Sequence, residues 1–385
     1  MIVKKIGDSM ITPLGFSVEE NFAAVMAGRS ELCRYESLWN LPFPCFVSLI
    51  PDEKLEAELA RELSAVDIAS LGTKFEKIAL LSAVKAVKQS GIDPTSERVV
   101  FILSSTKGNV ELLADENLDI ERVTPAHTAQ MIATYFGNPN MPITVSNACI
   151  SGLCAQIEAH RCLMSGRYDA AVVIGADVLS PFIVAGFQSL KALSDEQCRP
   201  FSVNRKGLNL GEAAATVVYS VDDDAADGWR MLAGAVRNDA NHISGPSRTG
   251  EGSYQALTSL IRVNGLETSD LACLNVHGTA TLYNDEMESI AITRAGLADV
   301  PVNAMKGFYG HTLGAAGVLE TVLSMRALEE GIVPATRGFD ELGVSMPVKV
   351  SSRAVDTAKH TFVKLLSGFG GCNAAAAFTR QISAR

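Results

Sequence analysis

Short apolar segments rich in β-branched residues alternate along the chain with longer segments whose apolar positions recur every three or four residues. The first kind is typical of buried strands and the second of amphipathic helices. Five segments predict strands, at residues 99–106, 170–178, 213–221, 271–279 and 360–369. Four segments between them predict helices, at residues 75–91, 149–166, 284–296 and 315–331. This alternation indicates an α/β fold.

An acidic, turn-forming stretch, SVDDDAADGW at residues 220–229, follows one of the predicted strands. The chain has 385 residues, which is more than one ordinary domain holds. We therefore expect two lobes that are joined at this stretch. The N-terminal lobe would comprise residues 1–222 and the C-terminal lobe residues 228–385.

Composition narrows the class of protein. Hydrophobic residues make up 47% of the chain and charged residues 20%, which is typical of a compact globular enzyme. The net charge of −10, without any block of lysine and arginine, disfavours a nucleic-acid partner or an anionic membrane surface. The first residues lack the apolar stretch of a signal peptide, and no apolar run reaches the length of a membrane span, so we expect a cytoplasmic protein. The eight cysteines form no CxxC pair and no spacing with histidine that resembles a zinc site, so we expect free thiols and no metal.

Cys149 lies where an extended segment meets a predicted helix, in TVSNACISGLCAQIEAH at residues 144–160. The free N–H groups and the positive dipole end of a helix favour a thiolate and predict a pKa below the ordinary value of about 8.5. Small neighbouring residues leave room for a substrate, and a backbone N–H beside the sulfur could stabilise an oxyanion. The alternative, a buried thiol that only packs the joint, is the commoner role of a free cysteine.

Two histidines strengthen the case for catalysis. His277 lies in NVHGTATLYNDEMES and His311 in KGFYGHTLGAAG, each in a glycine-containing turn. A single histidine of this kind is more often structural. Together with Cys149, the two imidazoles predict a catalytic set.

Around these residues the sequence closely resembles the β-ketoacyl-acyl carrier protein synthases, the condensing enzymes of fatty acid and polyketide synthesis, in the elongating class that uses Cys, His and His. The resemblance covers nearly the whole chain. It rests on the ordered motifs MITPLG, SNACISG, GRYDAAVVIGAD, CRPFSVNRKGLNLGEAAA, HGTATLYNDEMES, KGFYGHTLGAAGVLE and SGFGGCNAA. It implies a thiolase-like fold, in which two similar lobes stack as a five-layered αβαβα body with the site between them.

The resemblance also implies the roles of the site residues. Cys149 would accept an acyl group from an acyl carrier protein. His277 and His311 would then stabilise the enolate that forms when malonyl-acyl carrier protein loses carbon dioxide, and this enolate would attack the acyl group in a decarboxylative Claisen condensation. Lys306 matches the family's active-site lysine. Phe369 matches the phenylalanine that gates the acyl pocket and supplies a second oxyanion N–H.

Further matches imply supporting roles. Glu320 would steady the polar network, and Asp285 and Glu288 match an acidic pair that follows the first histidine. Thr279 and Thr281 match threonines that bind the phosphopantetheine arm. The alternatives are turn capping and a solvated helix face for the acidic pair, and ordinary turn chemistry for the threonines.

The family likeness further implies the partners. We expect an acyl carrier protein, which brings the phosphopantetheine arm, and no other cofactor. We also expect a homodimer, or a heterodimer with a related synthase subunit.

Some positions depart from the family pattern while the catalytic set is kept. Ala280, Leu282 and Tyr283 interrupt the usual HGTGTPLND, and Ser367 replaces the aromatic residue before GFGG. We therefore expect a specialised type II synthase, of a polyketide, aryl polyene or similar pathway. The alternative is a non-catalytic partner that resembles a chain length factor, but such partners typically lack the nucleophilic cysteine.

Overall fold

The computed structural model describes the whole chain except residues 115–118, 223–226, 240, 242–244 and 382–385. Five strands of the N-terminal part lie in the order β5-β4-β6-β8-β1. They are β1 (Ile2–Ile11), β4 (Val99–Ser104), β5 (Ile143–Val145), β6 (Ala170–Asp177) and β8 (Ala213–Asp222). Every residue of β6 is buried, which explains its continuous apolar sequence.

The strands of the C-terminal part follow the order β14-β12-β11-β16-β17-β9, and β10 pairs with β17. They are β9 (Gly228–Met231), β10 (Ala235–Asn238), β11 (Leu271–Asn275), β12 (Pro301–Asn303), β14 (Lys349–Val350), β16 (Thr361–Gly368) and β17 (Cys372–Gln381). The two parts meet where β1 and β9 pair antiparallel, so that together they form one 12-stranded sheet.

The two parts of the sheet have the same strand order. Apart from β10 and β14, each part places its first strand beside its last, followed by its penultimate, its second and its third strand. Such a repeat is consistent with two similar lobes. The central residues of the predicted joint, 223–226, lie outside the described residues, between the end of β8 and the start of β9. The lobe boundary therefore stays a prediction.

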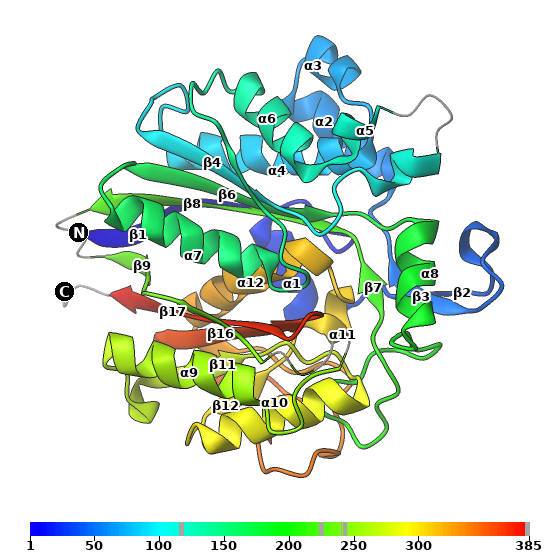
Figure 1. Ribbon diagram of the computed structural model, residues 1–385, viewed down its shortest axis with the longest axis vertical. Coiled ribbons are helices and arrows are strands. Elements are labelled where there is room, and N and C mark those ends of the chain that lie inside the picture. The colour runs from blue at the N-terminus through cyan, green and yellow to red at the C-terminus, as the bar shows by residue number, and fades with distance from the viewer. Residues whose placement is uncertain (115–118, 223–226, 240, 242–244, 382–385) are drawn as a thin grey trace.

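Helices form three layers around the two parts of the sheet (Figure 1). Helices α1 (Val18–Met26), α7 (Ser151–Met164) and α12 (Ala316–Glu329) lie between them. Helices α4 (Lys74–Ser90) and α6 (Pro125–Tyr135) cover the outer face of the N-terminal part, and α9 (Glu251–Asn264) and α10 (Leu282–Arg294) cover the outer face of the C-terminal part. The predicted five-layered αβαβα arrangement is confirmed.

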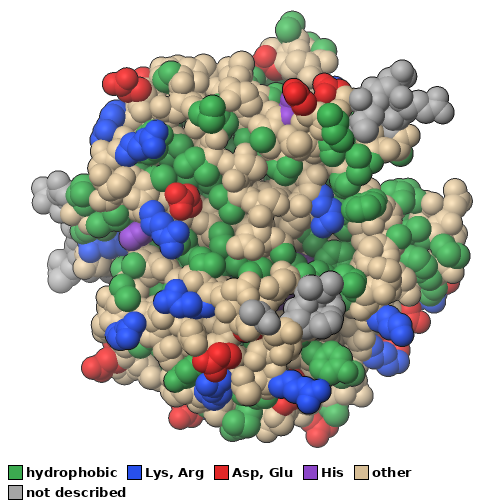
Figure 2. Space-filling model, viewed as in Figure 1, with side chains coloured by type: hydrophobic (Ala, Val, Ile, Leu, Met, Phe, Trp, Pro, Cys, Tyr) green, Lys and Arg blue, Asp and Glu red, His purple; other side chains and the backbone are tan. Residues whose placement is uncertain are grey.

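The remaining described elements are further helices, short strands and 3₁₀ turns. The helices are α2 (Asp52–Glu62), α3 (Ala65–Ser70), α5 (Ile120–Val123), α8 (Pro181–Ser189) and α11 (Lys306–Tyr309). The short strands are β2 (Cys33–Tyr35), β3 (Cys45–Ser48), β7 (Leu210–Gly211), β13 (Ile332–Val333) and β15 (Val355–Asp356), and the 3₁₀ turns lie at Leu38–Asn40, Val110–Ala114, Thr268–Asp270 and Leu313–Ala315. On the face shown in Figure 2, acidic and basic side chains are interspersed. Within the described ranges, no helix combines the length and apolarity that a membrane crossing requires.

The central helices α7 and α12 approach each other closely at glycines. A Cβ added at Gly317 would lie 2.3 Å from the backbone nitrogen of Leu153, and one added at Gly152 would lie 2.7 Å from the carbonyl oxygen of Gly314. Only the missing side chains allow this contact. Because Gly152 is three residues from Cys149, the same contact positions the start of α7 and the thiol before it.

We expect Gly317→Ala to lower the free energy of unfolding by about 1–3 kcal/mol, because the added methyl group overlaps the backbone of α7. Urea unfolding followed by circular dichroism measures the change. Gly186→Ala, inside α8, is the control, since nothing lies within 4 Å of its added Cβ, and it is expected to leave stability unchanged or raise it slightly. Equal losses in both variants would contradict the packing argument.

Candidate active site

Cys149 lies in a sharp turn between β5 and α7. The residue before it, Ala148, has a φ of +45°, in the left-handed region that residues other than glycine rarely adopt. This strained turn presents a nucleophile just before a helix. The Cys149 side chain is almost fully buried, and the backbone N–H of Phe369 lies near enough to its sulfur to oppose the rise in the pKa of the thiol.

The turn between β16 and β17 lies against the nucleophile. A Cβ added at Gly368 would lie 3.1 Å from the backbone nitrogen of Cys149 and 2.9 Å from Cys372 Sγ. Glycine is therefore required for this close approach. The contact brings the backbone of Phe369 beside Cys149, and the N–H groups of these two residues are the candidate oxyanion donors.

Cys149, His277 and His311 converge, although they are far apart in the sequence. His277 follows β11, and His311 follows α11. The two imidazole rings lie 5.1 Å apart between centroids and are nearly perpendicular, at 85°. Cys149 Sγ and one ring nitrogen of each histidine all lie within 4.8 Å of one another. A single small group could therefore contact all three.

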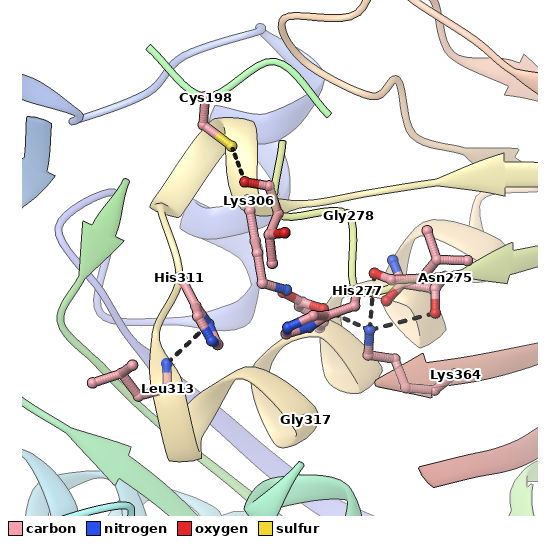
Figure 3. A network of polar contacts seen from close by, with 12 residues as sticks. Cys198, Asn275, His277, Gly278, Lys306, His311, Leu313, Gly317 and Lys364 are labelled. Carbon is pink, nitrogen blue, oxygen red and sulfur yellow. Dashed lines mark hydrogen bonds and ion pairs between the residues drawn. The ribbon is translucent and has the colours of Figure 1, made fainter. Parts of the chain in front are cut away.

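Both imidazoles are held neutral. Burial lowers the pKa of His277 and His311 well below the ordinary value, and the nearby Lys306 and Lys364 ammonium groups lower both further. His311 Nδ1 accepts a hydrogen bond from the Leu313 N–H at 3.3 Å, so the neutral ring carries its proton on Nε2 (Figure 3). That Nε2 has no hydrogen-bond partner among the described residues.

A buried carboxylate is shared by two lysines beside the histidines. Glu320 Oε1 lies 2.9 Å from Lys306 Nζ, and Glu320 Oε2 lies 2.6 Å from Lys364 Nζ. Lys364 was missed in the sequence. The sequence did contain an indication of its role. Lys364 is a charged residue inside the apolar segment HTFVKLLSGF, and a charged side chain in a fully buried strand needs a buried partner.

Glu288 holds the loop that carries the first histidine. Its carboxylate accepts hydrogen bonds from the N–H groups of His277 and Gly278, both at 2.7 Å, and from Asn284 Nδ2 at 2.8 Å. Burial raises its pKa to about 7. The alternative of a solvated helix face is wrong for Glu288, because this side chain is fully buried.

Asp285 holds the next part of the same loop. It accepts hydrogen bonds from the N–H groups of Phe201 at 2.7 Å, Thr279 at 3.0 Å and Ala280 at 3.2 Å. Burial raises the pKa of Asp285 to about 6. Ala280 has a φ of +61°, so these contacts hold a strained backbone in place.

A cavity of about 360 Å³ opens beside the nucleophile. Its lining includes Cys149, both histidines, Thr279, Thr281, Phe187, Phe369, Leu282 and Tyr283. The hydroxyl groups of Thr279 and Thr281 lie 2.9 Å apart. Leu282 and Tyr283 are 57% and 78% exposed, which places two apolar side chains at the rim where the sequence departs from the family pattern.

Comparison with known proteins identifies the family. Residues 51–225 match the model of the β-ketoacyl synthase N-terminal domain, and residues 230–340 match that of the β-ketoacyl synthase C-terminal domain. The chain belongs to the β-ketoacyl synthase family. The 3-oxoacyl-[acyl-carrier-protein] synthase 2 of Vibrio cholerae serotype O1 is 29% identical over 415 residues, which cover 97% of this chain and 98% of that protein.

Solved structures show the same fold. A β-ketoacyl synthase from Burkholderia phymatum STM815 is similar with a TM-score of 0.89 at 24% identity, covering 98% of this chain and 99% of that chain. A ketosynthase in complex with its chain length factor, from Xenorhabdus doucetiae, is similar with a TM-score of 0.86 at 23% identity, covering 98% of both chains.

The site also contains a buried aspartate that was missed in the sequence. Asp177, at the end of β6, is fully buried and accepts hydrogen bonds from Ser105 Oγ at 2.7 Å and from the Gly314 N–H at 2.6 Å. It thereby ties the segment after His311 to the end of β4. The signal was a carboxylate that directly continues an apolar strand, in AAVVIGAD.

The expected low pKa of Cys149 is wrong. Burial raises the pKa of this thiol above its ordinary value, and this effect outweighs the opposing influence of Lys306, Lys107 and the Phe369 N–H. The sequence argument considered the helix end but not the loss of water around the sulfur. The thiol of Cys149 is therefore protonated at neutral pH in the protein without substrate.

We expect the rate at which iodoacetamide alkylates Cys149 to rise through the alkaline range, with a midpoint above that of an ordinary cysteine thiol. The thiolate is the reacting form, and a raised pKa moves its formation to higher pH. Peptide mass spectrometry of Cys149 over a pH series measures this midpoint. A midpoint below pH 8 would contradict the prediction.

Proposed function

We propose that the protein catalyses a decarboxylative Claisen condensation between an acyl group on Cys149 and malonyl-acyl carrier protein. The product is a β-ketoacyl-acyl carrier protein, made in fatty acid or polyketide-type synthesis. The observation that carries the proposal is the meeting of Cys149 Sγ with one nitrogen each of His277 and His311, within 4.8 Å, in the lining of one cavity.

The first half-reaction loads the enzyme. The Cys149 sulfur attacks the thioester carbonyl of an acyl-acyl carrier protein, and the resulting oxyanion accepts hydrogen bonds from the N–H groups of Cys149 and Phe369. The carrier's thiolate then leaves and takes up the proton that Cys149 gave up. The lowering influence of the Phe369 N–H on the pKa of the unacylated thiol supports this placement of the donors.

The second half-reaction forms the carbon–carbon bond. Malonyl thioester loses carbon dioxide, and the electron pair of the broken bond forms an enolate whose oxygen accepts hydrogen bonds from His277 and His311. Neutral imidazoles suit this task, because each carries a donor N–H without competing for the proton of the thiol. The enolate carbon attacks the acyl-cysteine carbonyl, and the Cys149 thiolate leaves.

The remaining residues position this chemistry. Lys306, held by Glu320, places positive charge beside the histidines where the enolate develops. Asp285 and Glu288 hold the loop of the first histidine. Thr279 and Thr281 bind the phosphopantetheine arm, a role supported by their place in the cavity lining.

The proposed reaction needs no prosthetic group beyond the arm that the acyl carrier protein brings. A cysteine and two histidines could also ligate a metal ion at this spacing. The ammonium groups of Lys306 and Lys364, which lower the pKa of both histidines, would also repel a metal cation at this position.

The partners are an acyl carrier protein and a second synthase subunit, identical or related. The Xenorhabdus ketosynthase is in complex with its chain length factor, which keeps a partner role for this chain as the alternative function. The presence of Cys149, His277, His311 and Lys306 together in one site favours the catalytic role.

Cys149→Ala is expected to abolish both the acyl adduct and condensation, because the attacking atom is lost. His311→Ala is expected to keep the adduct and to lower the condensation rate by about 10²–10³-fold, because it removes one enolate donor. Intact-protein mass spectrometry with acyl-acyl carrier protein and a product assay with the malonyl form separate the two steps. An adduct that persists in Cys149→Ala would refute the assignment.

We further expect a preference among primers. The apolar rim at Leu282 and Tyr283 favours unsaturated or aryl acyl groups over saturated chains of ordinary length. Competition between these acyl-acyl carrier proteins for Cys149, with the adducts resolved by mass spectrometry, measures the preference. Equal loading of all primers would remove the case for a specialised pathway.

A further inference from the structure

The ammonium of Lys364 sits in a cage of oxygen atoms. Lys364 lies in β16 in register with Asn275 of the parallel neighbour β11. Its Nζ lies 2.6 Å from Glu320 Oε2 and 3.4 Å from each of the carbonyl oxygens of Asn275, Val276 and Leu365. We call these four oxygens the Lys364 cage. The side chain has no exposed surface.

The cage includes the last two carbonyls before the first histidine. Val276 directly precedes His277, and its own N–H donates to the Asn303 carbonyl at 2.9 Å. Lys364 thus contacts two successive carbonyls at the point where β11 ends and the loop of the first histidine begins (Figure 3). The Lys364 ammonium is thus the cation that three backbone carbonyls and one carboxylate oxygen share at this point.

The cage also controls the carboxylate that serves Lys306. Glu320 divides its two oxygens between the two lysines. Removal of Lys364 would free Oε2 and leave the carboxylate able to rotate, so that Lys306 would lose its defined position beside the histidines. Burial lowers the pKa of Lys364 to about 8, against the opposing influence of Glu320, so the group keeps its proton at neutral pH.

We infer that Lys364 is a positioning residue for the condensation: its ammonium acts as a tethered monovalent cation that fills the Lys364 cage and holds both the His277 loop and the Glu320–Lys306 pair in reacting geometry. The inference rests on the proposed function. The inference goes beyond the proposed function because it assigns a role to Lys364, which does not line the cavity and is not expected to touch the substrate.

The geometry predicts which step depends on the cage. Acyl transfer to Cys149 uses the sulfur and the N–H groups of Cys149 and Phe369, none of which belongs to the cage. Condensation uses His277, which directly follows it. A displacement of about 1 Å in a catalytic group can cost about 10²-fold in rate. We therefore expect loss of the cation to slow condensation by about 10²-fold and to leave acylation nearly unchanged.

Two variants test the inference with the full-length protein. Lys364→Ala empties the cage, whereas Lys364→Met fills the space of the stem without a charge. Ammonium chloride is expected to restore condensation in Lys364→Ala, because the small ion can take the vacated position. It is not expected to restore Lys364→Met, and tetramethylammonium chloride at equal ionic strength, being too large, is not expected to restore either variant.

Lys85→Ala is the matched control. Lys85 is a partly buried lysine that pairs with Glu58 at 2.9 Å and donates to the Phe16 carbonyl, outside the site. Its loss is expected to leave acylation and condensation unchanged, with or without ammonium. Intact-protein mass spectrometry measures acylation of Cys149, and product formation from the malonyl carrier measures condensation.

The outcomes separate this inference from the proposed function. Selective loss of condensation in Lys364→Ala, with rescue by ammonium alone, supports the inference. Normal condensation, or a parallel loss of acylation and condensation without rescue, overturns it. Should Lys364→Ala fail to fold, Lys364→Met is used instead: loss of condensation with normal acylation supports the inference, and normal condensation or loss of both steps overturns it. A wild-type protein that acquires an acyl group but makes no condensation product would refute the proposed function itself.

Discussion

The site depends on one constraint, which is that charged side chains are buried between the two parts of the sheet. Glu320 has almost no access to water and is stabilised by Lys306 and Lys364, which are equally buried. Asp177, Asp285 and Glu288 are stabilised differently, by backbone N–H groups. In a medium of low dielectric constant each such charge needs partners at fixed positions, so the groups that stabilise the carboxylates also fix the catalytic loops. The same hydrogen bonds and ion pairs therefore stabilise the buried charges and make the site rigid.

The same burial sets the state of the reacting groups before substrate binds. It disfavours the thiolate of Cys149 and the imidazolium forms of His277 and His311. These neutral forms suit the proposed condensation, in which both histidines would donate hydrogen bonds to an enolate. Acyl transfer needs a thiolate, and this requirement is met only as the thioester arrives and the oxyanion donors come into use. The raised pKa also protects the thiol from modification in the absence of substrate, because the thiolate is the reactive form.

Segments with a strong local signal were predicted correctly, and segments with a weak one were missed. The apolar, β-branched segments at 99–106 and 170–178 form β4 and β6, and the segments at 75–91 and 315–331 form helices α4 and α12. Strand β17 was missed because its run of alanines carries no strand propensity, and β1 because lysines interrupt its apolar positions. Both are stabilised by strand neighbours from distant parts of the chain.

The sequence by itself determined the α/β class, the family and which residues form the candidate site, because motifs such as SNACISG and KGFYGHTLGAAG are local and their chemistry depends on residue type. Only the tertiary structure decided the protonation of Cys149 and the roles of Lys364, Asp177 and Glu288. These properties arise from desolvation and from partners that lie 10 or more residues away. Burial is a property of the packed fold, and no short stretch of sequence contains it.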